Sequence, residues 1–287
     1  MIHIATVHWQ SEHWIDVQLS YLARNISQPF RVYAWLNNVP GDHCRKFHYV
    51  NTESVSDHAV KLNILADLIY FDSNRHDDLI IFLDGDAFPI GDVIAFARQK
   101  LEKQQLVAVQ RLENNGDLQP HPCFCVTTVG FWKRIGGDWK QGYEWNNSQG
   151  EPVTDVGGNL LGLLRREKVD WHPMLRSNRI NLHPLWFGIY EGLIYHHGAA
   201  FRQPLSRIDI AKASADARRT WRWPLVAMLK RLTGTSPGSD RRPWQRDLWL
   251  FNPQRSLEKQ ATQRNRDLLD RIFKGLRSDP EFYREFV

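Results

Sequence analysis

The sequence predicts an α/β fold whose twisted, mainly parallel sheet is flanked by helices. Strand-like and helix-like patterns alternate along residues 2–110, which is typical of βαβ units with right-handed crossovers. The run Leu79–Leu83 is apolar throughout, as in strands that are buried on both faces. A chain of 287 residues is long enough for one large domain of this kind with an appended segment.

The expected elements follow one another without an internal repeat. Strands are expected over Ile2–Val7, Phe30–Leu36, Leu79–Leu83, Leu106–Gln110, Val169–Trp171 and Leu193–His196. Helices are expected over Glu12–Ile26 with Ser11 as its cap, Asp57–Tyr70, Asp92–Glu102 with Asp92 as its cap, Thr154–Arg166 and Leu257–Leu276. Residues 111–150 are rich in Gly, Pro, Asn and Trp, and this irregular stretch is interpreted as a binding region.

Charge is distributed unevenly along the chain. The net charge is +5, but residues 201–287 carry 19 Lys and Arg against 10 Asp and Glu, so residues 1–200 have an acidic excess. We therefore expect a boundary near residue 205, with an α/β domain over 1–205 and a basic, Trp-rich and mostly helical extension over 206–287. Residues 233–240 have the composition of a linker.

The cysteines and the N-terminal residues bear on the compartment. Cys44, Cys123 and Cys125 are an odd number in a sizeable chain, which argues against a disulfide framework, and no second cysteine pair completes a zinc site. Residues 1–7 have neither the basic start nor the cleavage site of a signal peptide, and no apolar run approaches membrane-spanning length. The expected location is the cytoplasm.

Two carboxylates end the apolar run, in the sequence Asp84-Gly85-Asp86. Ligands of open α/β sheets collect beyond the carboxyl ends of their strands. Two acids there, with a glycine that allows close approach, suit Mg²⁺ or Mn²⁺ carrying a phosphorylated substrate. The alternative is a polar turn that merely closes the strand, because Asp and Gly are common turn formers. The tight pair after such an apolar run favours the metal site.

Several common enzyme motifs are absent from the sequence. It contains no Gly-x-Gly-x-x-Gly dinucleotide fingerprint, no phosphate-binding Gly-x-x-x-x-Gly-Lys-Ser/Thr loop, no Gly-x-Ser-x-Gly elbow and no His-Glu-x-x-His. Their absence argues against Rossmann-type oxidoreductases, P-loop kinases, α/β-hydrolases and zincins.

The remaining pattern resembles the nucleotide-sugar-dependent glycosyltransferases of GT-A fold. Asp84-Gly85-Asp86 matches their Asp-x-Asp motif, and residues 195–202, Tyr-His-His-Gly-Ala-Ala-Phe-Arg, resemble their late metal and pyrophosphate segment. Residues 61–63 and 154–159 add to the likeness, which covers roughly residues 1–205. The resemblance implies a GT-A-like catalytic domain that moves a sugar from a nucleoside diphosphate to an acceptor hydroxyl with the help of Mn²⁺ or Mg²⁺. The acceptor would be a glycan or a lipid-linked molecule.

The resemblance also implies roles for the metal and diphosphate ligands. Asp86 would bind the ion, Asp84 would reach the ribose or a metal-bound water, and Arg202 would stabilise the leaving diphosphate. Adjacent strand residues face opposite sides, so only one of His196 and His197 can point into the site. His196 precedes Arg202 by six positions as the family pattern requires, but the glycine comes one position early, and both histidines stay candidates.

Asp155 is the candidate for the group that meets the acceptor. In an enzyme that inverts the anomeric centre it would be the general base. The alternative is that Thr154 or Asp155 only caps the following helix. Glu151 is a weaker candidate for the base.

Further residues are candidates for binding the donor. The resemblance places the base against the backbone of Thr6 and Val7, and the diphosphate near Gly85 and Gly198. Lys61 is a candidate for the diphosphate or the sugar, with a solvated lysine as the alternative, and Asp138 for a sugar hydroxyl. One of three tryptophans in the irregular stretch could stack on a sugar ring, although core packing is the usual role of such residues: Trp132, Trp139 and Trp145.

The segment Arg218–Arg231 mixes cationic, tryptophan and aliphatic residues. This composition is typical of a segment on an anionic membrane surface, so a peripheral position at the inner face of the membrane is expected. The alternative is a solvated basic helix packed on the catalytic domain. Nucleic-acid binding is not expected, because no recognised module surrounds these charges. Two rival functions remain, a metal-dependent phosphohydrolase of haloacid-dehalogenase type and a non-enzymatic membrane-binding protein.

Overall fold

The computed structural model describes residues 1–39, 41–198, 203–232 and 253–287. The chain forms two compact units, of which the first comprises Met1–Phe201 together with Asp279–Val287 and the second comprises Arg202–Ser278. Among the described residues, no helix combines the length and the apolar character that crossing a membrane requires.

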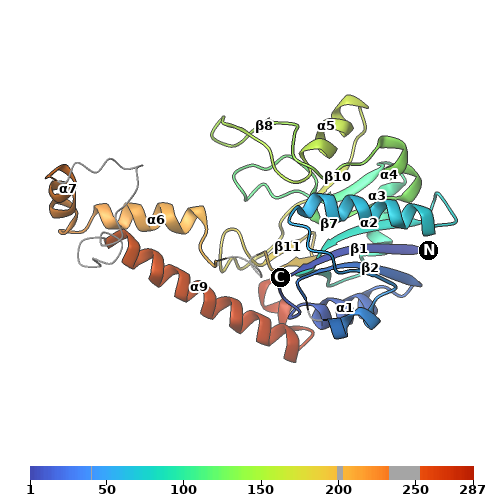
Figure 1. The fold of residues 1–287 in the computed structure, drawn as a ribbon, viewed down its shortest axis with the longest axis horizontal. Coiled ribbons are helices and arrows are strands. Elements are labelled where there is room, and N and C mark those ends of the chain that lie inside the picture. Colours follow the sequence, from blue (N-terminus) through green and yellow to red (C-terminus); the bar gives the residue numbers. More distant parts are fainter. Residues whose placement is uncertain (40, 199–202, 233–252) are drawn as a thin grey trace. The chain divides into compact units, whose positions relative to one another are not determined.

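The elements of the first unit alternate much as the sequence predicts (Figure 1). Its strands are β1 (Ile2–Trp9), β2 (Phe30–Asn37), β3 (Tyr49–Asn51), β4 (Leu79–Asp84), β5 (Ala87–Pro89), β6 (Leu106–Val109), β7 (His121–Thr128), β8 (Trp145–Asn146), β9 (Pro152–Val153), β10 (His172–Met174), β11 (Gly188–Tyr190) and β12 (Ile194–His196). Its helices are α1 (Ile15–Asn25), η1 (Gly41–Lys46), α2 (His58–Asp72), α3 (Val93–Leu101), α4 (Val129–Ile135), α5 (Gly158–Arg166) and η3 (Phe282–Phe286).

A seven-stranded sheet forms the centre of this unit, in the order β10-β6-β7-β4-β1-β2-β3. The strands β4, β1, β2 and β3 run parallel to one another, whereas β7 runs antiparallel to both β4 and β6. A small antiparallel sheet, β11-β12-β5, continues from the end of β4, and β8 pairs with β9. The predicted fold class, a mainly parallel sheet flanked by helices, is confirmed.

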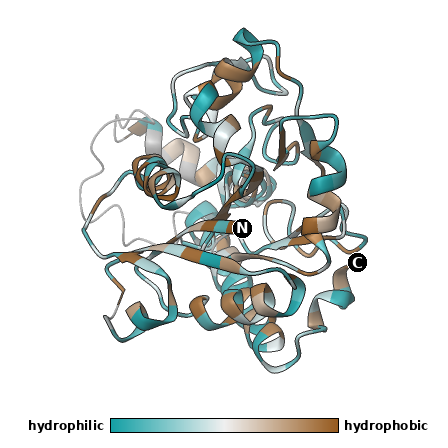
Figure 2. Ribbon diagram, turned by 90° about the vertical axis from the view of Figure 1, so that its right-hand side faces the viewer, coloured by the Kyte–Doolittle hydropathy of each residue, from teal (hydrophilic) through white to brown (hydrophobic). Residues whose placement is uncertain are grey.

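The central strand β4 is buried on both faces, which explains why its sequence does not alternate between apolar and polar residues. Leu79, Ile81 and Leu83 pack into one hydrophobic cluster together with α1 and α3, whereas Ile80 and Phe82 pack into another with α2, α4 and α5. Helices therefore cover both faces of the sheet, with α1 and α2 on opposite sides (Figure 1). The helical ribbons of the molecule carry both hydrophobic and hydrophilic segments (Figure 2).

Of the two predicted caps, at Ser11 and Asp92, only Asp92 is present, and Asp57 is a cap that was not predicted. The side chain of Asp57 accepts hydrogen bonds from the N–H groups of residues 59 and 60, and that of Asp92 accepts one from Ala95. The cap predicted at Ser11 is wrong. The helix begins only at Ile15, Trp14 occupies the cap position without a side-chain bond, and the Ser11 hydroxyl instead accepts the N–H of His13 in the preceding turn.

The stretch 111–150 is more regular than predicted. It contains all of β7, a central strand of the sheet, and all of α4, the helix that follows this strand. The many Gly, Pro and Asn residues on either side of this strand led the composition of the stretch to predict irregular structure. Thr128 caps α4, and Gly136 ends it with a φ of +65°. The predicted start of α5 at Thr154 and the strand predicted at Val169–Trp171 also lie several residues too early.

The second unit is helical in its described residues. It contains α6 (Arg207–Arg218), α7 (Trp223–Leu232) and α9 (Pro253–Ser278), and the predicted terminal helix Leu257–Leu276 lies within α9. Small side chains are buried along α6 and α9, at Ala213, Ala217 and Ala261, and allow the two helices to pack closely. The linker expected over 233–240 lies outside the described residues.

Candidate metal and substrate site

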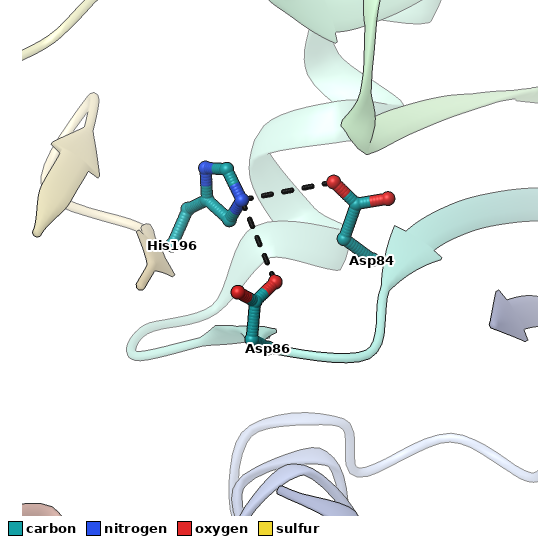
Figure 3. Close-up of side chains that lie close together, drawn as sticks. All are labelled: Asp84, Asp86 and His196. Atoms are coloured by element: carbon teal, nitrogen blue, oxygen red, sulfur yellow. Dashed lines mark ion pairs between the residues drawn. The ribbon is translucent and has the colours of Figure 1, made fainter. Parts of the chain in front are cut away.

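Asp84, Asp86 and His196 converge at the end of β4 (Figure 3). Nε2 of His196 lies 3.6 Å from Oδ2 of Asp84 and 3.5 Å from Oδ1 of Asp86. One ligand atom from each of the three residues lies within 4.8 Å of the others. Asp86 and His196 are buried, and Asp84 is partly exposed. The carboxyl end of a parallel strand thus carries a compact group of oxygen and nitrogen ligands.

The small antiparallel sheet brings His196 to the two carboxylates. In this sheet β12 pairs with β5, so that His196 lies opposite Ala87, the residue next to Asp86. Two backbone N–H groups after β12 then donate to Asp86, one to its backbone oxygen and one to its carboxylate. The N–H of His197 donates to the backbone oxygen of Asp86 (3.0 Å), and the N–H of Gly198 donates to its Oδ2 (3.2 Å). Gly198 has a φ of +78°, a conformation that favours glycine.

His58 contacts Asp84 from the other side of the group. It is the first residue of α2, and its Nε2 lies 3.1 Å from Oδ1 of Asp84. One oxygen of Asp84 therefore meets His58 while the other faces His196. Sequence reasoning missed His58, although its position directly after the cap Asp57 was a usable signal that it lies at the sheet edge where ligands collect.

Gln18 supports the turn that carries both carboxylates. Its buried amide donates to the backbone oxygens of Asp84 and Ala87, each at 2.8 Å, and its Oε1 accepts bonds from Thr6 Oγ1 and His8 Nε2. Because Oε1 can only accept, His8 must carry its proton on Nε2. Burial lowers the pKa of His8 to about 4, which keeps this imidazole neutral.

Gly85 allows the same turn to lie against β1. A Cβ at this position would lie 2.6 Å from the backbone oxygen of Val7 and 2.7 Å from Nδ1 of His8. No side chain fits there without displacing the turn. The sequence assigned this glycine to the approach of a ligand, whereas the structure gives it a role in packing against the protein's own backbone.

The donor set fits a divalent cation. The two carboxylates suit either Mn²⁺ or Mg²⁺, whereas the imidazole favours Mn²⁺ over Mg²⁺, because Mg²⁺ takes oxygen ligands almost exclusively. The hydrogen bonds from His58 and from the N–H of Gly198 hold the two carboxylates in place, as outer partners of metal ligands commonly do.

His197 lies outside this group. Its Nδ1 is 3.0 Å from the hydroxyl of Tyr195, and its ring packs against those of Trp14 and Phe187. Burial lowers the pKa of His197 to about 3, so it stays neutral. The alternation of side chains along the strand thus sends His196 toward the carboxylates and His197 into the core.

Asp138 holds two elements together. Its Oδ1 accepts from the amide of Asn63 on α2 (2.6 Å) and from the N–H of Lys140 (3.0 Å), and its Oδ2 accepts from the amide of Asn159 on α5 (2.7 Å). Burial alone would raise the pKa of this carboxyl, but the three hydrogen bonds outweigh burial and lower it. Its oxygens are therefore occupied within the protein before any sugar arrives.

Asp155 precedes α5 but does not cap it. The cap position belongs to Gly157, at a φ of +92°, and α5 has no side-chain cap, so the interpretation of Asp155 or Thr154 as a cap is wrong. The carboxylate of Asp155 lies near that of Asp117. Burial raises the pKa of Asp117 to about 6, and the charge of Asp155 contributes to the rise. Glu151 is exposed and bonded to Asn147 in the hairpin of β8 and β9.

Sequence reasoning also missed a cationic side chain in this part of the unit. Arg111 is buried, with Nη1 3.5 Å from Nε2 of His121, and the His121 ring centroid lies 5.9 Å from that of His196. The charge of Arg111 also lowers the pKa of Asp117, against the effect of burial. No pattern in the stretch 111–150 distinguishes Arg111 from an ordinary surface arginine.

Lys61 is a buried cation in α2. Its Nζ has no hydrogen-bond partner among the described residues and lies 4.8 Å from the centroid of the Trp9 ring. Burial lowers the pKa of Lys61, and the charge of Asp57 opposes the change. An ammonium group without a bonded partner is costly to bury, which makes Lys61 a candidate for meeting an anionic ligand.

The other predicted residues are placed as follows. Thr6 and Val7 are buried within β1, in register with both β2 and β4, so the structure does not bring them to an open surface. Arg202 lies outside the described residues. The three tryptophans of the irregular stretch, Trp132, Trp139 and Trp145, are all buried, and the first two of them pack in the hydrophobic core.

Comparisons with known proteins give a partial likeness of shape. No family model matches the chain, and no curated protein does. TarS of S. aureus has a TM-score of 0.40 and 11% identity, over 82% of this chain and 44% of its own. The glycosyltransferase GlyE of Streptococcus pneumoniae has a TM-score of 0.38 and 12% identity, over 60% and 44%. The catalytic domain of Drosophila beta1,4-galactosyltransferase 7, in complex with xylobiose, has a TM-score of 0.37 and 10% identity, over 68% and 69%.

The chain spans less than half the length of the TarS and GlyE chains. Because these TM-scores are low, the assignment of fold rests on the topology and the site of the chain itself. Its mixed, mostly parallel sheet has helices on both faces, and Asp84, Asp86 and His196 meet at the carboxyl end of a central strand. These features agree with the α/β arrangement that the sequence predicts, with a ligand site at the carboxyl edge of the sheet.

Proposed function

We propose that this chain is a glycosyltransferase that moves a sugar from a nucleoside diphosphate to an acceptor hydroxyl, with Mn²⁺ or Mg²⁺ held by Asp84, Asp86 and His196. The observation that carries the proposal is the convergence of these three side chains from two distant parts of the sequence. A bound divalent ion would neutralise the negative charge that develops on the leaving diphosphate.

The protein's own groups then bind and orient the reactants. Asp86 would hold the ion, and Asp84 would reach the ion or the ribose, with its carboxylate oriented by the hydrogen bond to His58. Lys61 meets a phosphate or a sugar oxygen, which would supply the bonded partner that its Nζ lacks among the described residues. In a transfer that inverts the anomeric centre, Asp155 accepts the proton of the acceptor hydroxyl as the hydroxyl oxygen displaces the diphosphate. The half-exposed position of Asp155, which is free of a capping role, supports this assignment.

The donor is tested by binding and by turnover. Calorimetry with UDP and GDP, each with Mn²⁺ and with a chelator, should show that one nucleotide binds at least about tenfold more tightly with the ion. Mass spectrometry after incubation with a panel of nucleotide sugars then identifies the sugar that is transferred or hydrolysed. Turnover of phosphate esters without affinity for any nucleotide would instead support a phosphohydrolase and overturn the proposal.

Replacing Asp155 tests the general base. The Asp155→Asn variant should lose about 10²–10⁴ in kcat, because the amide cannot accept the proton, while the KM for the donor changes little. Glu151→Gln is the matched control, since that exposed side chain lies in the neighbouring hairpin, and its kcat should stay unchanged. Steady-state transfer assays measure both, and a kcat unaffected in Asp155→Asn would remove this residue from the mechanism.

We also propose a cytoplasmic location, which the three free cysteines, Cys44, Cys123 and Cys125, support. A glycan or a lipid-linked acceptor at the inner face of the membrane would suit such a location. The partner that the basic second unit would meet there is an anionic lipid surface.

A further inference from the structure

The helix α7 exposes an apolar face. Leu225, Met228 and Leu232 follow one another at intervals of three and four residues, which places them on one side of the helix. Trp221 lies in the turn that leads into α7. The exposed fractions of the four side chains are 74% for Trp221, 47% for Leu225, 53% for Met228 and 74% for Leu232. We call these four residues the α7 face.

Cationic side chains accompany the α7 face, and acidic ones are absent from the same stretch. Residues 217–239 contain five basic residues and no Asp or Glu: Arg218, Arg219, Arg222, Lys230 and Arg231. The guanidinium of Arg222 lies 5.4 Å from the centroid of the Trp221 ring, next to the α7 face. A partner for this surface must therefore offer apolar area and negative charge together.

An anionic bilayer surface offers both. Scattered exposed leucines are ordinary on a protein surface, but three large apolar residues on one side of a helix, with a tryptophan just before the helix and arginines beside it, are typical of helices that lie in a membrane interface. Tryptophan rings settle at headgroup depth, and long cationic side chains reach the phosphates while their stems stay in the apolar layer. Arg222 is exposed and lies beside the Trp221 ring, where its guanidinium could reach a lipid phosphate.

We propose that the α7 face binds the surface of an anionic lipid bilayer, with Trp221, Leu225, Met228 and Leu232 entering the headgroup and acyl-chain boundary. Arg222 and Arg231 contact lipid phosphates on either side. The binding depends on no residue of the metal site, so it can be tested whether or not the chain transfers sugars.

Co-sedimentation of the full chain with vesicles tests this proposal. The vesicles are made of phosphatidylcholine alone, or of phosphatidylcholine with phosphatidylglycerol. The wild-type chain should sediment with the anionic vesicles, and a double variant, Leu225→Glu with Met228→Glu, should partition at least about tenfold less. Phe71→Glu is the matched control: Phe71 is 79% exposed on α2 of the first unit, and its replacement should leave partitioning unchanged.

A second pair of variants separates the electrostatic contribution to vesicle binding from the apolar contribution. Arg222→Gln and Arg231→Gln should each weaken partitioning about fivefold, and the loss should shrink as salt is added. Circular dichroism checks that all variants stay folded, and Asp86→Ala should partition like the wild type.

Two outcomes would overturn the proposal. In one, the Leu225→Glu, Met228→Glu double variant and Phe71→Glu partition equally. In the other, the wild-type chain binds no vesicle but forms dimers, and the double variant is monomeric. The α7 face would then be a protein interface.

Discussion

Replacing Asp86 with asparagine is expected to abolish metal-dependent binding of the nucleotide and to lower the transfer rate on the order of 10³-fold. The amide keeps the size of the side chain and can still accept the N–H of Gly198, so the turn should stay in place. It loses the negative charge that a divalent ion requires beside Asp84 and His196. Calorimetry with Mn²⁺ and the identified nucleotide, followed by a transfer assay, measures both effects.

The control for this experiment is Asp92→Ala. Asp92 is an acid on the same segment, but its side chain caps α3 by accepting the N–H of Ala95. Its loss should cost about 1 kcal/mol in the free energy of unfolding and leave transfer intact. An Asp86→Asn variant that binds the nucleotide with Mn²⁺ as tightly as the wild type does would refute the assignment of the metal site.

The second large effect is expected from Gly85→Ala. The new methyl group would overlap the backbone oxygen of Val7 and the ring of His8, neither of which can move freely, because β1 lies between two strands and His8 is buried. The turn must shift away from β1 and carry Asp84 and Asp86 with it. We expect the free energy of unfolding to fall by about 3 kcal/mol and the affinity for Mn²⁺ to fall by at least about tenfold.

Chemical denaturation and Mn²⁺ titration measure the two quantities. Gly41→Ala is the matched control, since a Cβ at Gly41 meets no atom within 4 Å, and its effect on unfolding should stay within about 0.5 kcal/mol. If Gly85→Ala matched Gly41→Ala in stability and in affinity for Mn²⁺, the close contact between the turn and β1 would not be what positions the carboxylates.

The sequence was sufficient to predict the parts of the site that follow strand ends. The Asp84-Gly85-Asp86 turn is visible because a fully apolar strand precedes it, and the structure places both carboxylates with His196 at that edge. The choice between His196 and His197 could not be made from the sequence. It depends on the register of β12 against β5, which is a tertiary pairing that no local pattern specifies.

Residues that act through long-range contacts were not predictable. Gln18 belongs to α1 and bonds to backbone groups of β4 and β5, so its importance lies in where the helix packs rather than in its residue type. The antiparallel strand β7 was missed for a related reason. Its apolar centre at Cys123–Val126 is short and is flanked by turn-forming residues, whereas its stability comes from pairing with β4 and β6 on both sides.

After the helical unit, residues Asp279–Val287 rejoin the first unit. The carbonyl of Pro280 accepts the hydroxyl of Tyr21, the hydroxyl of Tyr283 donates to Ile90, and Phe286 is buried. The α/β unit is therefore assembled from two separate stretches of the sequence, and the helical unit is in effect an insertion between them. During synthesis, the sheet can form early, but its contacts with residues 280–286 must wait until those residues have left the ribosome.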